Sequence, residues 1–495
     1  MEKRFSVTGV FLIFLLFHSC AVNPVTGKRD FMLMSKDQEI AMGKQSDPEI
    51  INFFGIYEDE ELQKFIQEKG QEMVAVSHRS DLKYEFKIVD SPVVNAFAVP
   101  GGYVYFTRGI MAHFNNEAEF AGVLGHEIGH ITARHSAKQY SNGMLAQVGL
   151  AAGMIFAPEF AQFGDLANSG LQLLFLKFGR DAESQSDKLG VEYATKIGYD
   201  AHEMAGFFST LERLQKSSGG EAVPTFLSTH PDPADREQKV AKLADKWQRK
   251  TDAAALEVNA DRYLRMIDGI VYGEDPKQGF VENQVFYHPV LKFHFPIPTG
   301  WVYQNSPQQF QMAPEDGSAM MALTLAQSQG SLEKTAQAMV QNSQLSVIES
   351  QRATLNGLPV YMMVVEQSSA EQSVRALIYL IEYGGNVYNL MGVSAAANFN
   401  QYANVFKGTM NNFKALNDPD KLNRQPDRIR IKTVTQNSTL SQALRTFQVE
   451  NDRMEEVAVL NGMLLDDHVT KGNLIKVIDS QRPGERNETP STMRN

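Results

Sequence analysis

The sequence predicts a multidomain α+β protein: a mainly helical domain with a small antiparallel sheet, then an α+β domain and a small βααβ module. Three observations support this. The chain has 495 residues, about three times the length of a typical single domain. Apolar residues recur mostly at helical spacing before about residue 270 and mostly at strand spacing after about residue 280. A polar segment with two prolines, 417–427, then precedes a last strand–helix–helix–strand pattern.

The composition is that of an ordinary globular protein. Hydrophobic residues make up 43% and charged residues 21%, which excludes a disordered or collagen-like chain. Lys and Arg together number 47 against 58 for Asp and Glu, so the net charge is −11. A negatively charged protein repels a phosphate backbone, and nucleic acid is therefore not an expected partner.

The first 20 residues have the layout of an export signal. Lys3 and Arg4 precede the apolar run Val7–Phe17, which is too short to cross a bilayer as a mature helix. The signal ends in Ser-Cys and so resembles that of a bacterial lipoprotein, in which Cys20 would be lipidated and anchor the chain to a membrane. No Asp follows Cys20, which by analogy with enteric bacteria favours the outer membrane. An ordinary signal that is cut after Ala21 is the alternative.

Residues 21–270 are expected to form the first domain. The spacing of apolar residues predicts amphipathic helix over 37–77, and a Pro-Gly-Gly corner joins short strands. A long helix follows, which Asn115 or Asn116 can cap. The expected strands cover 84–89, 96–99 and 103–106, and later helices cover 181–196 and 203–215.

The stretch 143–176 is nearly uncharged and rich in apolar residues. Its longest uncharged run stops short of the roughly 20 residues that a membrane span needs. We therefore expect apolar helices packed over or beside the functional site, with a transmembrane hairpin as the alternative.

A second, α+β domain is expected over 280–416, after a boundary rich in Gly, Asp and Pro at 268–279. The last module covers 427–479, and the polar tail 480–495 is expected to be disordered. The strands of the second domain are expected at 291–295, 320–326, 358–366, 374–382 and 387–393, with helices at 332–344 and 399–410. Those of the module are expected at 429–434 and 474–478, with helices at 440–447 and 454–461.

Two histidines stand one helical turn apart inside the long helix, in the pentapeptide His126-Glu127-Ile128-Gly129-His130. At about 100° per residue they lie on one face, so both imidazoles can bind the same ion. Glu127 lies one residue round, where it can reach a water on the ion, which is typical of a general base. Because Cys20 is the only cysteine of the chain, any further ligand must be a His or a carboxylate. The alternative is a helix that carries two surface histidines.

Catalytic zinc requires a third protein ligand and an open position for water. Zinc peptidases whose third ligand is a histidine carry a Gly and a His where this chain has Ala133 and Ser136, and His135 is displaced by one, so that class is excluded. Glu183 on the next expected helix is one candidate among several acids. Asp187, one turn later, is placed to accept a hydrogen bond from a ligand histidine.

Five separated motifs appear in order between residues 21 and 270. They are Asn95–Gly102, Asn116–Glu119, His126–His135, Arg180–Gly190, and Ser228–Pro231 with Arg236. Together they resemble the zinc metallopeptidase family that includes HtpX, BepA and the CaaX prenyl endopeptidase. The resemblance implies a mainly helical zinc-peptidase domain with one Zn²⁺ per chain.

The resemblance also implies roles for single residues. His126, His130 and Glu183 would bind the zinc, Glu127 would be the general base, and Asp187 would orient a ligand from behind.

His230 would approach the metal, either stabilising the oxyanion or occupying the water site as a latch. The alternative is a loop histidine that caps Pro231.

The Asn95–Tyr105 segment would form an edge strand on which a substrate chain adds as a further strand. A plain core hairpin is the alternative. The residues assigned to this edge are Asn95, Ala96, Phe97, Gly101 and Gly102.

The later domains carry weaker resemblances. Phe293–Trp301 is similar to the opening strand of PsbP-like or Mog-like domains, and we expect this domain to recruit partners or substrates. The module 427–479 resembles a LysM module in Asn437–Leu440, Asn461-Gly462 and Lys471–Val477. This resemblance makes peptidoglycan a candidate partner. Because Asn437-Ser438 replaces the usual Gly-Asp of such modules, a purely structural module is the alternative.

These expectations combine into a zinc metalloendopeptidase of the bacterial cell envelope, periplasmic and lipid-anchored, which cleaves misfolded or unassembled envelope proteins with metal-activated water. The alternative is a chaperone-like or peptidoglycan-associated binding protein whose zinc is structural or latched by His230. A third hypothesis, membrane-embedded processing of prenylated proteins, requires 143–176 to span lipid.

Overall fold

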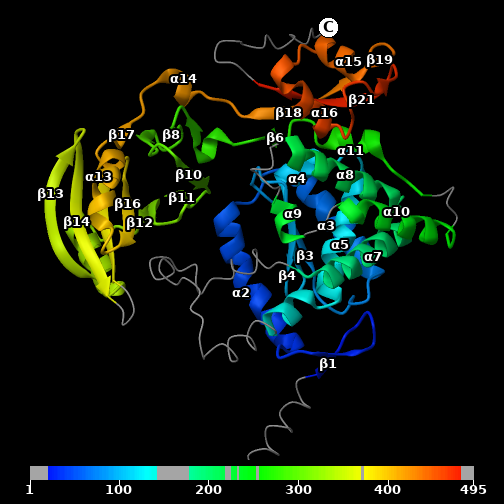
Figure 1. Cartoon of the computed structure of the whole chain (residues 1–495), viewed down its shortest axis with the longest axis horizontal. Coiled ribbons are helices and arrows are strands. Elements are labelled where there is room, and N and C mark those ends of the chain that lie inside the picture. Colours follow the sequence, from blue (N-terminus) through cyan, green and yellow to red (C-terminus); the bar gives the residue numbers. More distant parts are fainter. Residues whose placement is uncertain are drawn as a thin grey trace, which may run out of the picture. The chain divides into compact units, whose positions relative to one another are not determined.

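The computed structural model describes residues 20–141, 178–217, 225–230, 234–251, 256–368 and 373–480. The chain divides into two compact units (Figure 1). The described residues up to Tyr272 belong to the first unit, together with Arg428–Asp479. The second unit contains Gly273–Asp427. The C-terminal module therefore shares a unit with the N-terminal helices, although more than 150 residues of sequence separate them.

Helix α5 (Glu117–Thr132) is the centre of the first unit and is buried on every side. Asn116 caps it, because its side chain accepts a hydrogen bond from the Glu119 N–H. A helix that is buried on every side needs a core around it, and neighbouring helices supply that core. They are α3 (Glu60–Ala75), α4 (Arg108–His113), α7 (Arg180–Lys196), α8 (His202–Ser217), α9 (Thr225–Thr229), α10 (Ala234–Gln248) and α11 (Ala260–Met266). Helix α2 (Lys36–Phe54) packs in two smaller clusters.

Glycines let α7 approach α5 closely. A Cβ atom on Gly190 would lie 2.9 Å from the carbonyl oxygen of Gly122 and 3.1 Å from the backbone nitrogen of His126. Only a residue without a side chain fits at this distance. The crossing brings the acidic first half of α7 against the histidines of α5.

The first unit also contains a small sheet of β3 (Glu85–Val89), β4 (Ala96–Val99) and β5 (Tyr103–Thr107), in the order β3-β5-β4. Strand β4 is antiparallel to β5, but β3 is parallel to it. The prediction of an antiparallel sheet is therefore wrong for β3. The connection 90–95 carries the chain past the central position, so β5 returns between its two neighbours. A separate pair joins β1 (Cys20–Val22) to β2 (Arg29–Phe31).

The C-terminal module has the predicted strand–helix–helix–strand order. Its strand β18 (Asp427–Thr433) lies between β21 (Leu474–Asp479) and β6 (Val271–Tyr272), so the two parts of the first unit share one sheet. The ammonium of Lys476 is fully buried and donates to two carbonyls beside the end of α4, those of Ala112 (2.9 Å) and Phe114 (2.8 Å). The module's other elements are β19 (Ser438–Thr439), α15 (Leu440–Thr446), η6 (Asn451–Arg453), α16 (Met454–Leu460) and β20 (His468–Val469).

The second unit is an α+β fold built on antiparallel strands (Figure 1). A seven-stranded sheet has the order β10-β11-β12-β16-β15-β14-β13, and α13 packs against β15 and β16. A four-stranded sheet has the order β17-β9-β8-β7. The strands are β7 (Phe280–Glu282), β8 (Val285–His288), β9 (Phe293–Pro296), β10 (Trp301–Asn305), β11 (Gln309–Pro314), β12 (Ala319–Ala326), β13 (Ser346–Leu355), β14 (Leu358–Ser368), β15 (Ser373–Tyr383), β16 (Asn386–Ala395) and β17 (Lys414–Ala415); the helices are η5 (Pro276–Gln278), α12 (Leu332–Asn342), α13 (Phe399–Met410) and α14 (Pro419–Leu422).

Three predictions fall on residues outside those that the structure describes. They concern the export signal before Cys20, the apolar stretch 143–176 and the tail after Ser480. Among the described helices, none has the length and apolar character that crossing a membrane requires.

Candidate metal centre

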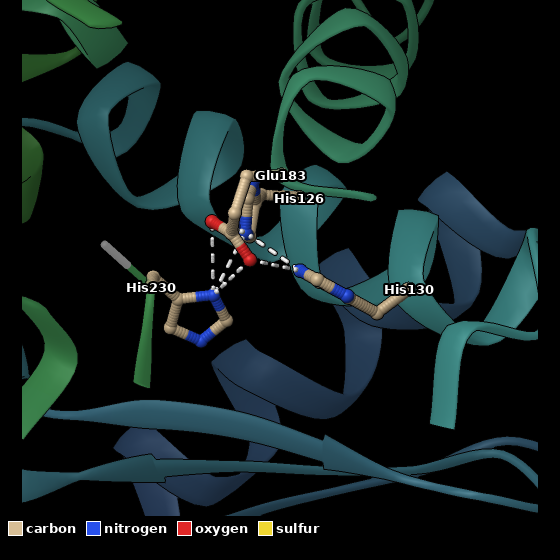
Figure 2. A group of neighbouring side chains, drawn as sticks. All are labelled: His126, His130, Glu183 and His230. Atoms are coloured by element: carbon tan, nitrogen blue, oxygen red, sulfur yellow. Dashed lines mark hydrogen bonds and ion pairs between the residues drawn. The ribbon is translucent and has the colours of Figure 1, made fainter. Parts of the chain in front are cut away.

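Helix α5 presents His126 and His130 to the same point, one turn apart (Figure 2). Their Nε2 atoms lie 2.9 Å from each other, and both side chains are buried. The predicted spacing thus produces the predicted convergence. Glu127 is also buried, and its Oε1 makes no hydrogen bond in the described part of the chain.

Helix α7 supplies a carboxylate to this pair. Glu183 lies with Oε2 3.6 Å from His126 Nε2 and Oε1 3.4 Å from His130 Nε2. The close crossing of α5 and α7 makes this approach possible.

His230 follows directly after α9 and completes the group (Figure 2). Its Nδ1 lies 3.2 Å from His126 Nε2 and 3.0 Å from Glu183 Oε1, and its Nε2 lies 3.6 Å from Glu127 Oε1. The ring of Phe226 stacks on the imidazole at 4.6 Å, which fixes its direction. We call His126, His130, Glu183 and His230 the four-donor site.

The four-donor site has the dimensions of a metal centre. One ligand atom from each residue lies within 4.8 Å of all the others. Nitrogen and oxygen ligands about 2.0–2.1 Å from a tetrahedral zinc ion are about 3.3 Å apart, close to the observed separations. Imidazole and carboxylate are donors that zinc accepts. The residues present therefore fit a single divalent cation.

Burial and mutual contact set the protonation of the group. Burial lowers the pKa of His130 well below its ordinary value, which favours the neutral imidazole that binds metals. Burial alone would raise the pKa of Glu183, but the charge of His230 and its hydrogen bond to the carboxylate hold that pKa well below its usual range. Burial raises the pKa of Glu127.

Arg236 on α10 lies behind the four-donor site and connects Asp187 on α7 with His230 after α9. Its Nε and Nη2 donate to both carboxylate oxygens of Asp187, at 3.0 and 2.6 Å, and its Nη1 donates to the carbonyl of His230. Asp187 Oδ1 in turn lies 2.9 Å from His126 Nδ1. Asp187 therefore contacts the ring nitrogen of His126 that faces away from the four-donor site, whereas sequence reasoning gave Arg236 no role. The available signal was an Arg in the same motif as His230, a candidate ligand.

The predicted substrate-edge residues lie on and beside β4. Strand β4 is at the edge of its sheet, next to α5, and Gly101 and Gly102 form the turn into β5 with φ of 88° and 106°. Ala96 and Phe97 are buried within β4. Asn95 is also buried, and its Oδ1 has no hydrogen-bond partner among the described residues. Cys20 lies in β1, apart from these elements in sequence.

A model of a protein family, "Peptidase family M48", matches residues 60–244. The mitochondrial metalloendopeptidase OMA1 of Schizosaccharomyces pombe is 30% identical over 241 residues, which cover 47% of this chain and 68% of that protein. OMA1 of Arabidopsis thaliana is 32% identical over 189 residues, 38% of this chain and 37% of that protein. The beta-barrel assembly-enhancing protease of Escherichia coli K12 is 27% identical over 241 residues, 47% of this chain and 48% of that protein.

The match spans between about a third and about two-thirds of the length of these relatives. Among solved structures, the cyanobacterial PsbP of Synechocystis sp. PCC 6803 matches 27% of this chain at 11% identity, but a TM-score of 0.22 supports no conclusion about the fold. The matched family region contains the whole four-donor site, and a relative 30% identical is covered over two-thirds of its length. This chain belongs to peptidase family M48.

Proposed function

We propose that this protein is a zinc-dependent endopeptidase of the bacterial cell envelope. The observation that carries the proposal is the four-donor site next to the buried Glu127 in a member of peptidase family M48. The proposed substrates are misfolded or unassembled envelope proteins. Relatives named beta-barrel assembly-enhancing protease support this substrate class.

The proposed ligands are His126, His130 and Glu183, and the proposed base is Glu127. A bound zinc ion supplies a Lewis acid that polarises the peptide carbonyl and lowers the pKa of water to about 7. Glu127 takes the proton of the attacking water and later gives it to the leaving amine. Its raised pKa suits both transfers, because a base that titrates closer to neutral pH also returns the proton readily. Asp187 holds His126 through Nδ1, so that Nε2 faces the other donors and would be free to bind the ion.

The proposed substrate edge is β4, because the opposite edge of the sheet is covered. Three glutamines of α3, one turn apart, bond to the backbone of β3 or the residue before it. Gln63 accepts the Ile88 N–H and donates to its carbonyl, Gln67 accepts the Phe86 N–H, and Gln71 donates to the Tyr84 carbonyl. An extended peptide can therefore pair with β4 but not with β3.

Asn95 lies beside that edge, and its buried Oδ1 accepts no hydrogen bond from any described residue. The preceding residue, Val94, accepts the backbone N–H of Phe226, whose ring stacks on His230. This contact links β4 to the four-donor site, so a chain bound along β4 passes close to the proposed metal.

The proposed location is the periplasm, with Cys20 as a lipid anchor to the outer membrane. The export-signal layout of residues 1–20 supports this location. Peptidoglycan is a proposed ligand of the LysM-like module, and the module's βααβ order supports it.

Replacing the proposed base tests the activity. Glu127→Gln should bind zinc as the wild-type protein does but lose casein cleavage, because an amide cannot take the water's proton. Glu192→Gln is a matched control, since Glu192 lies on α7 in an ion pair with Lys196, one turn away on the same helix. Full cleavage by Glu127→Gln would contradict the assignment.

A second candidate function is a chaperone-like or peptidoglycan-associated binding protein with a latched zinc. The position of His230 Nδ1 favours it, because a fourth protein ligand would close the tetrahedron and exclude water. Zinc content and casein cleavage of the wild-type protein and of His230→Ala distinguish the two. Bound zinc without cleavage in either protein would favour the binding function, and cleavage that increases in His230→Ala would identify a latch on an active enzyme.

A further inference from the structure

His130 has a partner behind it that the proposed mechanism does not use. Its Nε2 faces the four-donor site, and its Nδ1 lies 3.1 Å from Nδ1 of His135. His135 follows the end of α5 and is buried. The second ring nitrogen of His135, Nε2, lies 3.1 Å from Oε1 of Gln185 on α7.

The order of these contacts fixes the direction of each hydrogen bond. The Gln185 carbonyl oxygen accepts only, so the proton of His135 must sit on Nε2. A neutral His135 then has a bare Nδ1, which accepts the Nδ1–H of His130. Ser186 Oγ lies 3.3 Å from the same Nδ1, and its hydroxyl can donate there as well. His130 is left with a free electron pair on Nε2.

We propose that His135 and Gln185 are positioning residues that hold His130 in the tautomer and orientation that bind the metal. The inference rests on the proposed function, since it assigns a purpose to groups that surround a zinc ligand. The carboxylate of Asp187 holds His126, whereas the imidazole of His135 holds His130. Two ligands on the same helix are therefore oriented by partners of different chemical type.

His135 is buried, and an aromatic ring lies beside it. The ring of Phe178 lies 4.1 Å from that of His130 and 6.2 Å from that of His135, and it shields the relay from water. A neutral relay adds no charge to the buried site.

Removing the acceptor at the end of the relay tests the proposal. Gln185→Leu and the smaller Gln185→Ala should bind zinc about 10-fold more weakly, the lower end of the range for outer partners of metal ligands. Gln185→Glu keeps an oxygen acceptor and should restore the zinc affinity to within about threefold of wild type. The matched control is Gln67→Leu on α3, because Gln67 is also half-buried and its Oε1 accepts one hydrogen bond far from the site in sequence.

The measurement is zinc affinity of the full chain by competition with a chromogenic chelator, with casein cleavage at saturating zinc. We expect cleavage by Gln185→Leu to approach the wild-type rate once zinc saturates, while Gln67→Leu binds zinc normally. Wild-type zinc affinity in Gln185→Leu and Gln185→Ala, or equal weakening in Gln185→Glu, would overturn the relay and leave the proposed function intact. If the wild-type protein bound no zinc, both the relay and the proposed function would be overturned.

Discussion

The helix crossing at Gly190 controls whether Glu183 reaches the histidines of α5. A methyl group on Gly190 would lie 2.9 Å from the Gly122 carbonyl oxygen and 3.1 Å from the His126 nitrogen. Both neighbours are backbone atoms, which cannot rotate away as a side chain can. Gly190→Ala should therefore separate α7 from α5 and displace Glu183.

The magnitude follows from two opposing effects. Replacing a helix-interior glycine by alanine stabilises a helix by about 1 kcal/mol. Overpacking a closed interface costs about 1–3 kcal/mol. We expect Gly190→Ala to be about 0–2 kcal/mol less stable than wild type.

Gly206 provides the matched control, because it lies on α8 and a Cβ atom added to it would have no neighbouring atom within 4 Å. Gly206→Ala should be about 1 kcal/mol more stable, since only the helix preference acts there. Urea unfolding of both variants measures the free energies, and chelator competition measures zinc affinity, which should fall about 10-fold in Gly190→Ala alone. Equal stabilisation of the two variants with unchanged zinc affinity would refute the reasoning.

Three further perturbations have defined outcomes. Lys476→Met should lower the free energy of unfolding by about 2–4 kcal/mol, because two buried carbonyls lose their donor, whereas exposed Lys471→Met should change it by less than about 0.5 kcal/mol in urea unfolding. Partial burial would lower the pKa of His202, but the carboxylates of Asp245 and Asp200 raise it. The resulting stabilisation is complete below about pH 6.5 and is lost as the pH rises through the folded-state pKa, so the melting temperature of His202→Gln should fall less than that of wild type between pH 6 and 8. Removing metal with EDTA should lower the free energy of unfolding by about 2.7 kcal/mol if zinc had been present at 100 times its Kd, and the melting temperature should fall with it. An unchanged melting temperature would contradict a metal in the four-donor site.

The elements that local patterns specify were predictable. The apolar steps of α5 and the cap at Asn116 fixed the helix, and the helical repeat then placed His126 and His130 on one face. In the second unit, alternation and periodicity predicted β9, β12, β14, β15, β16, α12 and α13 in the same way, whereas β7, β8, β10, β11, β13 and β17 were not predicted. Each predicted element depends on residues within a few positions of one another.

Features that depend on distant partners were not predictable. The residues of β3 have the pattern of a strand, but the pattern does not say that β5 pairs with it in parallel. Lys476 alternates with apolar residues as a solvent-facing lysine would, yet it is buried because Ala112 and Phe114 offer two carbonyls. The motif spacing excluded His135 as a ligand and gave it no other role, although its contact with His130 Nδ1 places it behind one. The spacing of residues in the sequence does not tell where the side chains of Lys476 and His135 point.

The buried charges around the four-donor site favour a bound cation. Glu127, Glu183 and Asp187 are buried carboxylates, and Arg236 is the one buried cation that contacts two of them among the described residues. When the imidazoles are neutral, as metal binding requires, the three carboxylates and Arg236 together carry an excess of two negative charges, which are costly to bury without compensation. A single divalent cation balances this excess. The proposed zinc ion would therefore suit the four-donor site by charge as well as by geometry.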